Sequence, residues 1–319
     1  MLRRVFSSFA LIFAACGETA PPATSAADAA VASAPDAAPV VNDDAAAAVV
    51  HDDAAMVGIA DAAAPGADAG SQPDAAAAAG LDLTGVWAAR VVNSQCFNGG
   101  LAGRDTVQIT TLFRVELAQN GLVVSTMTTP CSVDLTPFGG NQTTYPAAAI
   151  TAIMTPGQTS HLSEARIGAT YTPDERVSLL GWRAAQGQDP KTAMVPEDEN
   201  DARLVDADND THPGVTLTVS GRLSGDIYIA NRNIVNITGT VISADRIQGR
   251  SNTVQIQHIV ASSNRLLGLS SIDATPNPDP ASSSYDLIRI PAGPDTCAQI
   301  IAQKATLFPA PGPVTPCPM

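Results

Sequence analysis

The 319-residue chain is acidic, since 31 Asp and Glu residues oppose 17 Lys and Arg residues and give a net charge of −14 at pH 7. The charge is uneven, with +2 in residues 1–16, −10 in residues 17–80 and −6 in residues 81–319. The last part is only mildly acidic and has no basic face, so the composition argues against a nucleic-acid partner held through its phosphates.

Residues 1–16 have the features of an export signal. Two arginines precede an apolar run that is too short to span a bilayer, because a spanning helix needs about 20 apolar residues. The run ends in LIFAAC, which resembles the lipobox of bacterial lipoproteins, with Phe13 where Leu is usual. The resemblance implies a lipid-anchored envelope protein acylated at Cys16. Gly17 is similar to the signal of outer-membrane lipoproteins, and an ordinary secretory signal is the alternative.

Residues 17–80 have the composition of a disordered stalk. Of these 64 residues, 27 are Ala, six are Pro and ten are Asp or Glu, and none is Phe, Tyr, Trp, Lys or Arg. Such a segment buries too little apolar surface to offset its conformational entropy. As a flexible coil it would span about 45 Å. We expect it to hold a folded domain, residues 81–319, away from the membrane.

Residues 81–319 carry the pattern of an all-β domain. Apolar and polar side chains alternate from Thr106 to Ala118, a period of two that a half-buried strand satisfies, and Asn120-Gly121 favours a tight hairpin. Further strands are predicted at residues 122–129, 147–154, 163–169, 177–184, 215–220, 226–231, 234–243, 246–249, 253–261, 265–270 and 285–290. Only residues 295–304 look helical, capped by Asp295 or Thr296. The pattern predicts an antiparallel β-barrel or β-sandwich with one short C-terminal helix.

Gly85 and Trp87 form a Gly-x-Trp motif at the first predicted strand. The motif resembles the start of lipocalin-like β-barrels, in which the tryptophan plugs the closed end and a helix follows the last strand. The resemblance implies a barrel with a ligand cavity. A strand that buries a tryptophan in some other β core is the alternative interpretation.

Four cysteines lie in the predicted domain: Cys96, Cys131, Cys297 and Cys317. An exported domain folds in an oxidising compartment, so two disulfides are expected, with three connectivities open. The simplest connectivity joins Cys96 to Cys131 and Cys297 to Cys317. No CxxC pair is present, which argues against a zinc-ribbon or thioredoxin-like site.

An acidic segment, residues 195–214, divides the domain and is the candidate metal site. Its seven carboxylates face a single base, Arg203. Asp206, Asp208 and Asp210 alternate along the chain, so a tight loop would turn their oxygen atoms toward one hard cation.

The candidate metal site departs from an EF-hand. Thr211 replaces the glycine of the sharp turn, and Leu217 stands where the bidentate glutamate belongs. We therefore expect a looser structural calcium loop, completed by a carboxylate such as Asp201 and by a ligand at His212. A solvated acidic loop without an ion is the alternative.

Catalytic motifs are absent from the sequence. It contains no GxSxG, SxxK or HExxH motif, no phosphate loop and no dinucleotide fingerprint. We therefore favour a binding module for an apolar ligand, a glycan or a protein, displayed at the bacterial cell envelope. The alternatives are a secreted hydrolase without a recognisable motif and a structural envelope lipoprotein.

Overall fold

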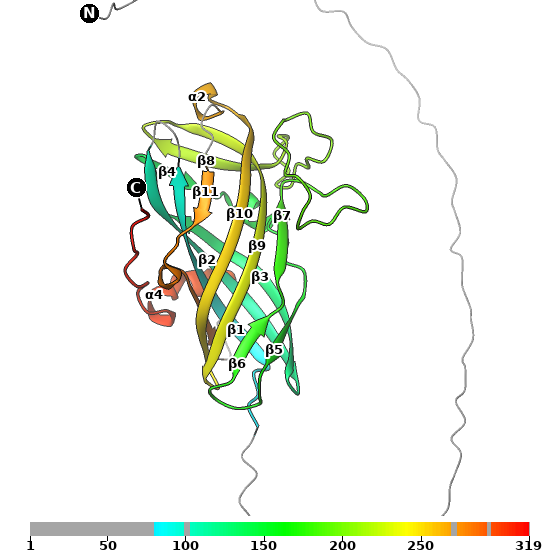
Figure 1. Ribbon diagram of the computed structural model, residues 1–319, viewed down its shortest axis with the longest axis vertical. Coiled ribbons are helices and arrows are strands. Elements are labelled where there is room, and N and C mark those ends of the chain that lie inside the picture. Colours follow the sequence, from blue (N-terminus) through cyan, green and yellow to red (C-terminus); the bar gives the residue numbers. More distant parts are fainter. Residues whose placement is uncertain (1–79, 99–102, 269–272, 292–294, 319) are drawn as a thin grey trace, which may run out of the picture. The chain divides into compact units, whose positions relative to one another are not determined.

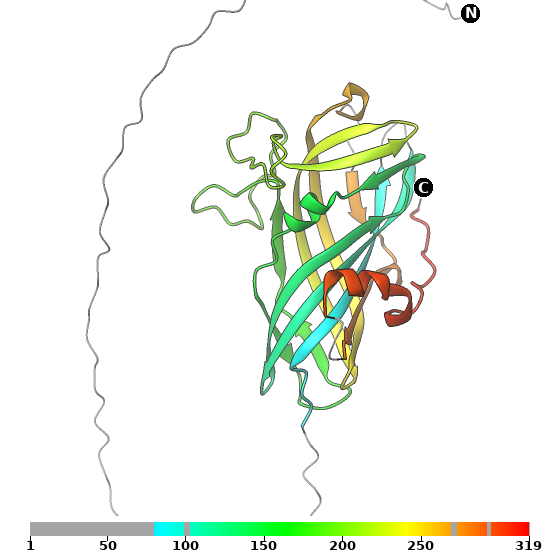
Figure 2. The ribbon, with the colours of Figure 1, turned by 180° about the vertical axis from the view of Figure 1, so that it is seen from behind.

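The computed structural model describes residues 80–98, 103–268, 273–291 and 295–318. They form an antiparallel sheet whose principal strands close into a ring (Figure 1, Figure 2). Around the ring the order is β1, β2, β3, β5, β6, β9, β10 and β12, and β12 returns to β1. The prediction of an antiparallel all-β domain is confirmed, and the ring makes it a barrel. The predicted signal and the stalk up to residue 79 lie outside the described residues.

The ring contains the long strands β1, β2 and β3 on one side, the long hairpin β9–β10 on the other, and the short strands β5, β6 and β12. Their bounds are β1 Gly85–Asn98, β2 Arg104–Asn120, β3 Val123–Leu135, β5 Gln158–Leu162, β6 Thr170–Pro173, β9 Gly225–Ser243, β10 Arg246–Ser262 and β12 Ser284–Arg289. The other strands are β4 Asn141–Thr144, β7 Arg176–Leu180, β8 Val215–Gly221 and β11 Asp273–Pro276. Along one edge of β9, the strands β6, β7 and β8 pair in succession, while β4 pairs with β8 and β11 with β1.

Strands β9 and β10 are each continuous where the sequence predicts two shorter strands. The predicted breaks fall at residues 232–233 and 250–252, whose polar side chains are typical of turns. In the structure Arg232 and Ser251 are buried, with exposed fractions of 8% and 5%. The polar residues therefore belong to the barrel wall rather than to turns.

Three segments predicted as strands have other structures. Residues 147–151 form helix α1 (Ala147–Thr151), because a run of alanines after Pro146 favours helix. Residues 163–169 make the bends between β5 and β6. Residues 265–268 form helix α2 (Arg265–Gly268), where Asn264 Oδ1 accepts a hydrogen bond from the Leu266 N–H and so caps the helix start.

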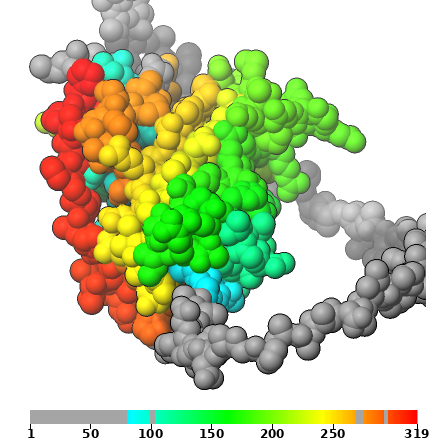
Figure 3. Space-filling view, turned by 60° about the horizontal axis from the view of Figure 1, so that its bottom comes forward, coloured from blue at the N-terminus to red at the C-terminus, as the bar shows by residue number. Residues whose placement is uncertain are grey.

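One end of the barrel is closed around Trp87, which is fully buried with its indole N–H donating to Leu83 O at 2.9 Å. The Arg289 guanidinium lies 4.6 Å from the Trp87 ring centre and donates to the backbone carbonyl groups of Asp82 and Thr84. Gly85 has a φ of 142°, and a Cβ atom there would lie 2.8 Å from Arg289 Nη1. The Gly-x-Trp spacing thus makes room for the arginine. Figure 3 views this end, where β1 (blue), the β2–β3 hairpin, the residues between β5 and β6 (green) and the β9–β10 turn (yellow) adjoin one another.

The predicted C-terminal helix is present outside the barrel as α3 (Cys297–Ala302) and α4 (Lys304–Leu307). A capping box between Thr296 and Gln299 begins α3. Ile300 and Phe308 pack on the outer face of β1 and β2 against Ala88 and Leu112. A short 3₁₀ turn, Pro280–Ser282, precedes β12. None of the helices in the described ranges has the length and hydropathy needed to cross a bilayer.

Two disulfides join the C-terminal segment to the barrel, and their connectivity corrects the simplest prediction. Cys96 pairs with Cys317, and Cys131 pairs with Cys297. Cys96 faces Thr106 of β2, whereas Cys131 lies in a bulge opposite the Leu112–Phe113 step of the same strand. Six residues of strand separate these levels by about 20 Å, far beyond the reach of a disulfide. The chain neighbours Cys96 and Cys131 therefore cannot pair.

Candidate binding site in the barrel

A cavity of about 100 Å³ lies inside the barrel, beyond the side chains packed around Trp87. Its wall comes from β1, β2 and β3 on one side and from β7, β9 and β10 on the other. Pockets for drug-sized ligands hold roughly 300–1,000 Å³, whereas an engineered cavity of about 150 Å³ in another protein binds benzene. The cavity therefore suits a ligand of a few non-hydrogen atoms.

The cavity lies beside a gap in the barrel wall between β3 and β7. On the side away from β2, β3 pairs with β5 only through Val123–Thr126, and β7 pairs with β9 alone among the described strands. Residues 145–155, which include α1, cover the gap, and Thr155 Oγ1 donates a hydrogen bond to the Thr128 carbonyl group. Met154 lines the cavity and is 73% exposed. The cavity thus reaches the surface beside α1.

Arg176 is the only charged residue among those that line the cavity. It begins β7, where strand alternation turns Arg176, Ser178 and Leu180 toward the interior. Its guanidinium lies 5.6 Å from the centre of the Phe113 ring. Within the described part of the chain this guanidinium makes no hydrogen bond and no ion pair. An unpartnered cation therefore faces the cavity.

Among the described residues, no carboxylate pairs with Arg176. The neighbouring carboxylate, Glu175, instead pairs with Lys191 at 2.6 Å. Tyr285 lies close enough to Arg176 to interact with it electrostatically. Burial raises the pKa of the Tyr171 and Tyr285 phenols, that of Tyr285 well above its ordinary value, so both are neutral at pH 7. Burial also lowers the pKa of the Arg176 guanidinium.

A buried chain of hydroxyl groups fixes the Tyr171 phenol in place. Ser160 Oγ donates to Tyr171 Oη at 2.9 Å and lies 3.4 Å from Thr126 Oγ1. The rings of Tyr171 and Tyr285 are parallel, with centres 6.5 Å apart. All four side chains are buried. Tyr171 of β6 is thus held by hydroxyl groups of β3 and β5, and its ring lies parallel to that of Tyr285 of β12, beside Arg176.

Polar side chains also line the barrel around and beside the cavity. Asn93 Oδ1 accepts hydrogen bonds from Ser251 Oγ and Thr253 Oγ1, each at 2.9 Å. Interior amides and hydroxyls that are hydrogen-bonded to one another or to the barrel backbone include Asn93, Gln95, Asn231, Asn233, Ser251, Thr253, Gln255 and Gln257. Gln95 Oε1 is shielded from solvent and has no partner. The interior of the barrel is thus polar beside the cavity, and most of these side chains are hydrogen-bonded to one another.

Sequence reasoning missed this interior site. The predicted strand 177–184 begins one residue after Arg176, and Ser251 fell in a predicted gap between strands. One signal was present in β10, where alternate residues are polar and face inward while Val254 and Ile256 face outward and are 44% and 37% exposed. That inverted alternation indicates a polar barrel interior.

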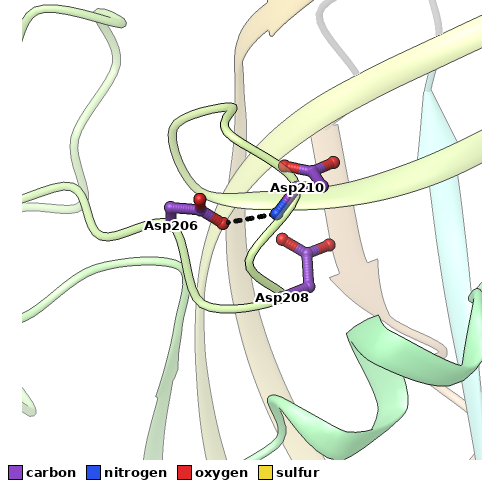
Figure 4. Close-up of side chains that lie close together, drawn as sticks. All are labelled: Asp206, Asp208 and Asp210. Carbon is purple, nitrogen blue, oxygen red and sulfur yellow. Dashed lines mark hydrogen bonds between the residues drawn. The ribbon is translucent and has the colours of Figure 1, made fainter.

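The acidic segment brings three predicted metal ligands together (Figure 4). Carboxylate oxygens of Asp206, Asp208 and Asp210 lie within 4.8 Å of one another. Asp206 accepts hydrogen bonds from the backbone N–H groups of Asp210 and Thr211, at 3.1 and 2.9 Å. Asp208 Oδ2 accepts one from Thr216 N at 2.8 Å. The loop is therefore held by its own carboxylates.

One carboxylate oxygen of this loop differs from the others in its hydrogen bonding. Asp208 Oδ1 is shielded from solvent and has no hydrogen-bond partner among the described residues. Burial raises the pKa of Asp208, and the charges of Asp210 and Asp206 raise it further. A cation among the three carboxylates would relieve both effects.

Asp201 does not join the triad's group of carboxylate oxygens, whereas His212 adjoins it, since the His212 backbone N–H donates to Asp210 Oδ1 at 2.9 Å. Asp201 pairs with Arg203 at 2.6 Å, which together with a backbone hydrogen bond lowers the pKa of Asp201. The His212 ring stacks on Tyr228 with ring centres 4.2 Å apart. The described residues thus bring three of the five predicted ligands into one group.

Comparisons with protein-family models, with curated proteins and with solved structures find no match for this chain. The assignment of a site therefore rests on the geometry described above.

Proposed function

We propose that residues 81–319 form a binding module that takes a small ligand into the barrel. The observation that carries the proposal is a surface-connected cavity whose lining combines apolar side chains with a few amides and hydroxyls and one arginine. Such a mixture of apolar wall and few convergent polar groups is typical of ligand sites. The lipobox resemblance at Cys16 supports placing the module at the bacterial cell envelope on a lipid anchor.

Binding is favoured over hydrolysis because of the residues around the cavity. A hydrolase needs a general base within reach of the substrate, most often a histidine. His161, His212 and His258 are all described, and none of them lines the cavity. The observed lining supplies hydrogen bonds and a charge, which are the requirements of binding.

We test the binding proposal on the full chain by measuring the melting temperature with a panel of small carboxylates, amides and alcohols. A ligand that enters the barrel should raise the melting temperature of the wild type. Ser178→Leu fills the cavity and should abolish the response, while Ser125→Leu, at an exposed position of β3, should keep it. A response that survives Ser178→Leu, or no response to any member of the panel, would refute the proposal.

A second candidate function is calcium binding by the acidic loop, and Asp208 Oδ1 is the observation that favours it. Asp206, Asp208 and Asp210 would hold the ion, which would supply only positive charge and oxygen coordination. The donor set fits, because calcium prefers carboxylate and carbonyl oxygens.

Calcium at ten times its dissociation constant should stabilise the fold by about 1.4 kcal/mol, which raises the melting temperature by about 3–6 °C. Asp208→Asn should remove the response and, without calcium, leave stability unchanged or raised. Asp198→Asn removes the same charge outside the triad and should retain the response. Equal melting temperatures with calcium and with a chelator would exclude the calcium site.

A further inference from the structure

We infer that the ligand of the barrel is a small carboxylate monoanion whose carboxylate group pairs with Arg176. The inference rests on the proposed binding function and names the class of ligand. It starts from Arg176, a cation in the barrel wall that has no anionic partner among the described residues.

Arg176 differs from the other arginines that are not fully exposed. Arg90 pairs with Asp286 at 2.7 Å, Arg203 with Asp201 at 2.6 Å, and Arg232 donates to the Ala193 carbonyl group. In the described ranges, each non-exposed arginine except Arg176 has such a partner. Arg176 is half-buried, with its guanidinium against the Phe113 ring, so it has lost part of its hydration. A bound anion would replace that lost hydration.

Charge balance selects a monoanion. Arg176 contributes one positive charge, and the cavity lining contains no second base. The neighbouring phenols of Tyr171 and Tyr285 are neutral, so they add no charge. A dianion such as hydrogen phosphate would leave one charge uncompensated in the barrel. The planar guanidinium also matches a planar carboxylate in a two-bond arrangement.

The apolar lining and the volume limit the rest of the ligand. Phe113, Leu180 and Val235 line the cavity with Arg176, so a short hydrocarbon chain would find apolar contacts beside the bound carboxylate. A volume of about 100 Å³ leaves room for a few carbon atoms. A carboxylate of butyrate size is therefore the fitting probe.

The test compares butyrate with butyramide, its neutral isostere, and with inorganic phosphate, using the full chain. Butyrate should raise the melting temperature, and the other two should not. Arg176→Met should weaken butyrate binding roughly 10- to 100-fold. Arg183→Met removes the same charge from an exposed position and should bind butyrate as the wild type does.

Arg176→Met also reports on the unpaired charge without any ligand. Its melting temperature should rise by about 2–4 °C over that of the ligand-free wild type, because an uncompensated cation is removed. If the variant does not fold, the Arg176 Nε–Hε resonance of the wild type replaces it, and should shift with butyrate and not with butyramide.

The possible results distinguish a failure of the carboxylate inference from a failure of the proposed binding function. Binding of butyramide or phosphate in place of butyrate would overturn the carboxylate inference and leave the binding function standing. Equal butyrate affinity in Arg176→Met and the wild type, or an unchanged Nε–Hε resonance, would do the same. Absence of binding across the whole panel would overturn both.

Discussion

Asp286→Ala is expected to lower the free energy of unfolding by about 3–5 kcal/mol, because it leaves a buried arginine without its counter-ion. Asp286 is 2% exposed and accepts from Arg90 Nη2 at 2.7 Å and from Arg246 Nη2 at 3.2 Å. Arg90 cannot turn to solvent, since its side chain is 8% exposed beneath the Phe308 ring. Denaturant unfolding of the variant and the wild type measures the loss.

The control is Asp134→Ala, which breaks an exposed ion pair with Lys304 and should cost less than about 1 kcal/mol. Arg90→Met combined with Asp286→Leu removes both buried charges and should recover most of the stability lost in Asp286→Ala. Equal stabilities of Asp286→Ala and Asp134→Ala would contradict the prediction.

Arg90 and Arg176 illustrate two uses of the same side chain. Arg90 lies outside the barrel, under the C-terminal segment, and its partner Asp286 makes it structural. Arg176 lies inside, next to a cavity, and no carboxylate accompanies it. Removing the charge should therefore destabilise the fold at Asp286 and stabilise it at Arg176. Opposite signs of this kind separate a group kept for folding from one kept for binding.

The sequence was sufficient for those parts of the fold that depend on local pattern. The alternation of residues 106–118 and the Asn120-Gly121 turn predict β2 and its hairpin with β3, as observed. Local pattern failed at residues 147–154, where alanines between β4 and β5 form α1 instead of a strand. Local pattern also could not predict the disulfide connectivity. That connectivity depends on the register of neighbouring strands, which decides which cysteines lie at the same height in the barrel.

The two candidate sites also differ in how far the sequence alone reveals them. The acidic loop is visible in the sequence because its carboxylates are close along the chain. Arg176 is not visible, because its significance is the absence of a partner, and that depends on β2, β9 and β12 surrounding it. A single polar residue at the start of a predicted strand carries no such information.

Removal of either disulfide is expected to lower the free energy of unfolding by about 4–5 kcal/mol if chain entropy dominates. The Cys96–Cys317 bond joins residues 221 apart and the Cys131–Cys297 bond residues 166 apart. Loop entropy depends on the logarithm of length, so these separations differ in effect by only about 0.3 kcal/mol. The double variants Cys96→Ser/Cys317→Ser and Cys131→Ser/Cys297→Ser should therefore be destabilised almost equally.

If native packing rather than chain entropy determined the effect of the two disulfides, their removal would have unequal effects on stability. Cys131–Cys297 fixes α3, whose Ile300 is buried in a core cluster, whereas Cys317 is held by hydrogen bonds such as that from its N–H to Thr106 Oγ1. If native packing dominated, the Cys131/Cys297 variant would lose much more stability than the other. Urea unfolding of both variants measures the difference, and a gap above about 1 kcal/mol would reject the entropic account. Near-equality would mean that both bonds act chiefly by restricting the unfolded chain.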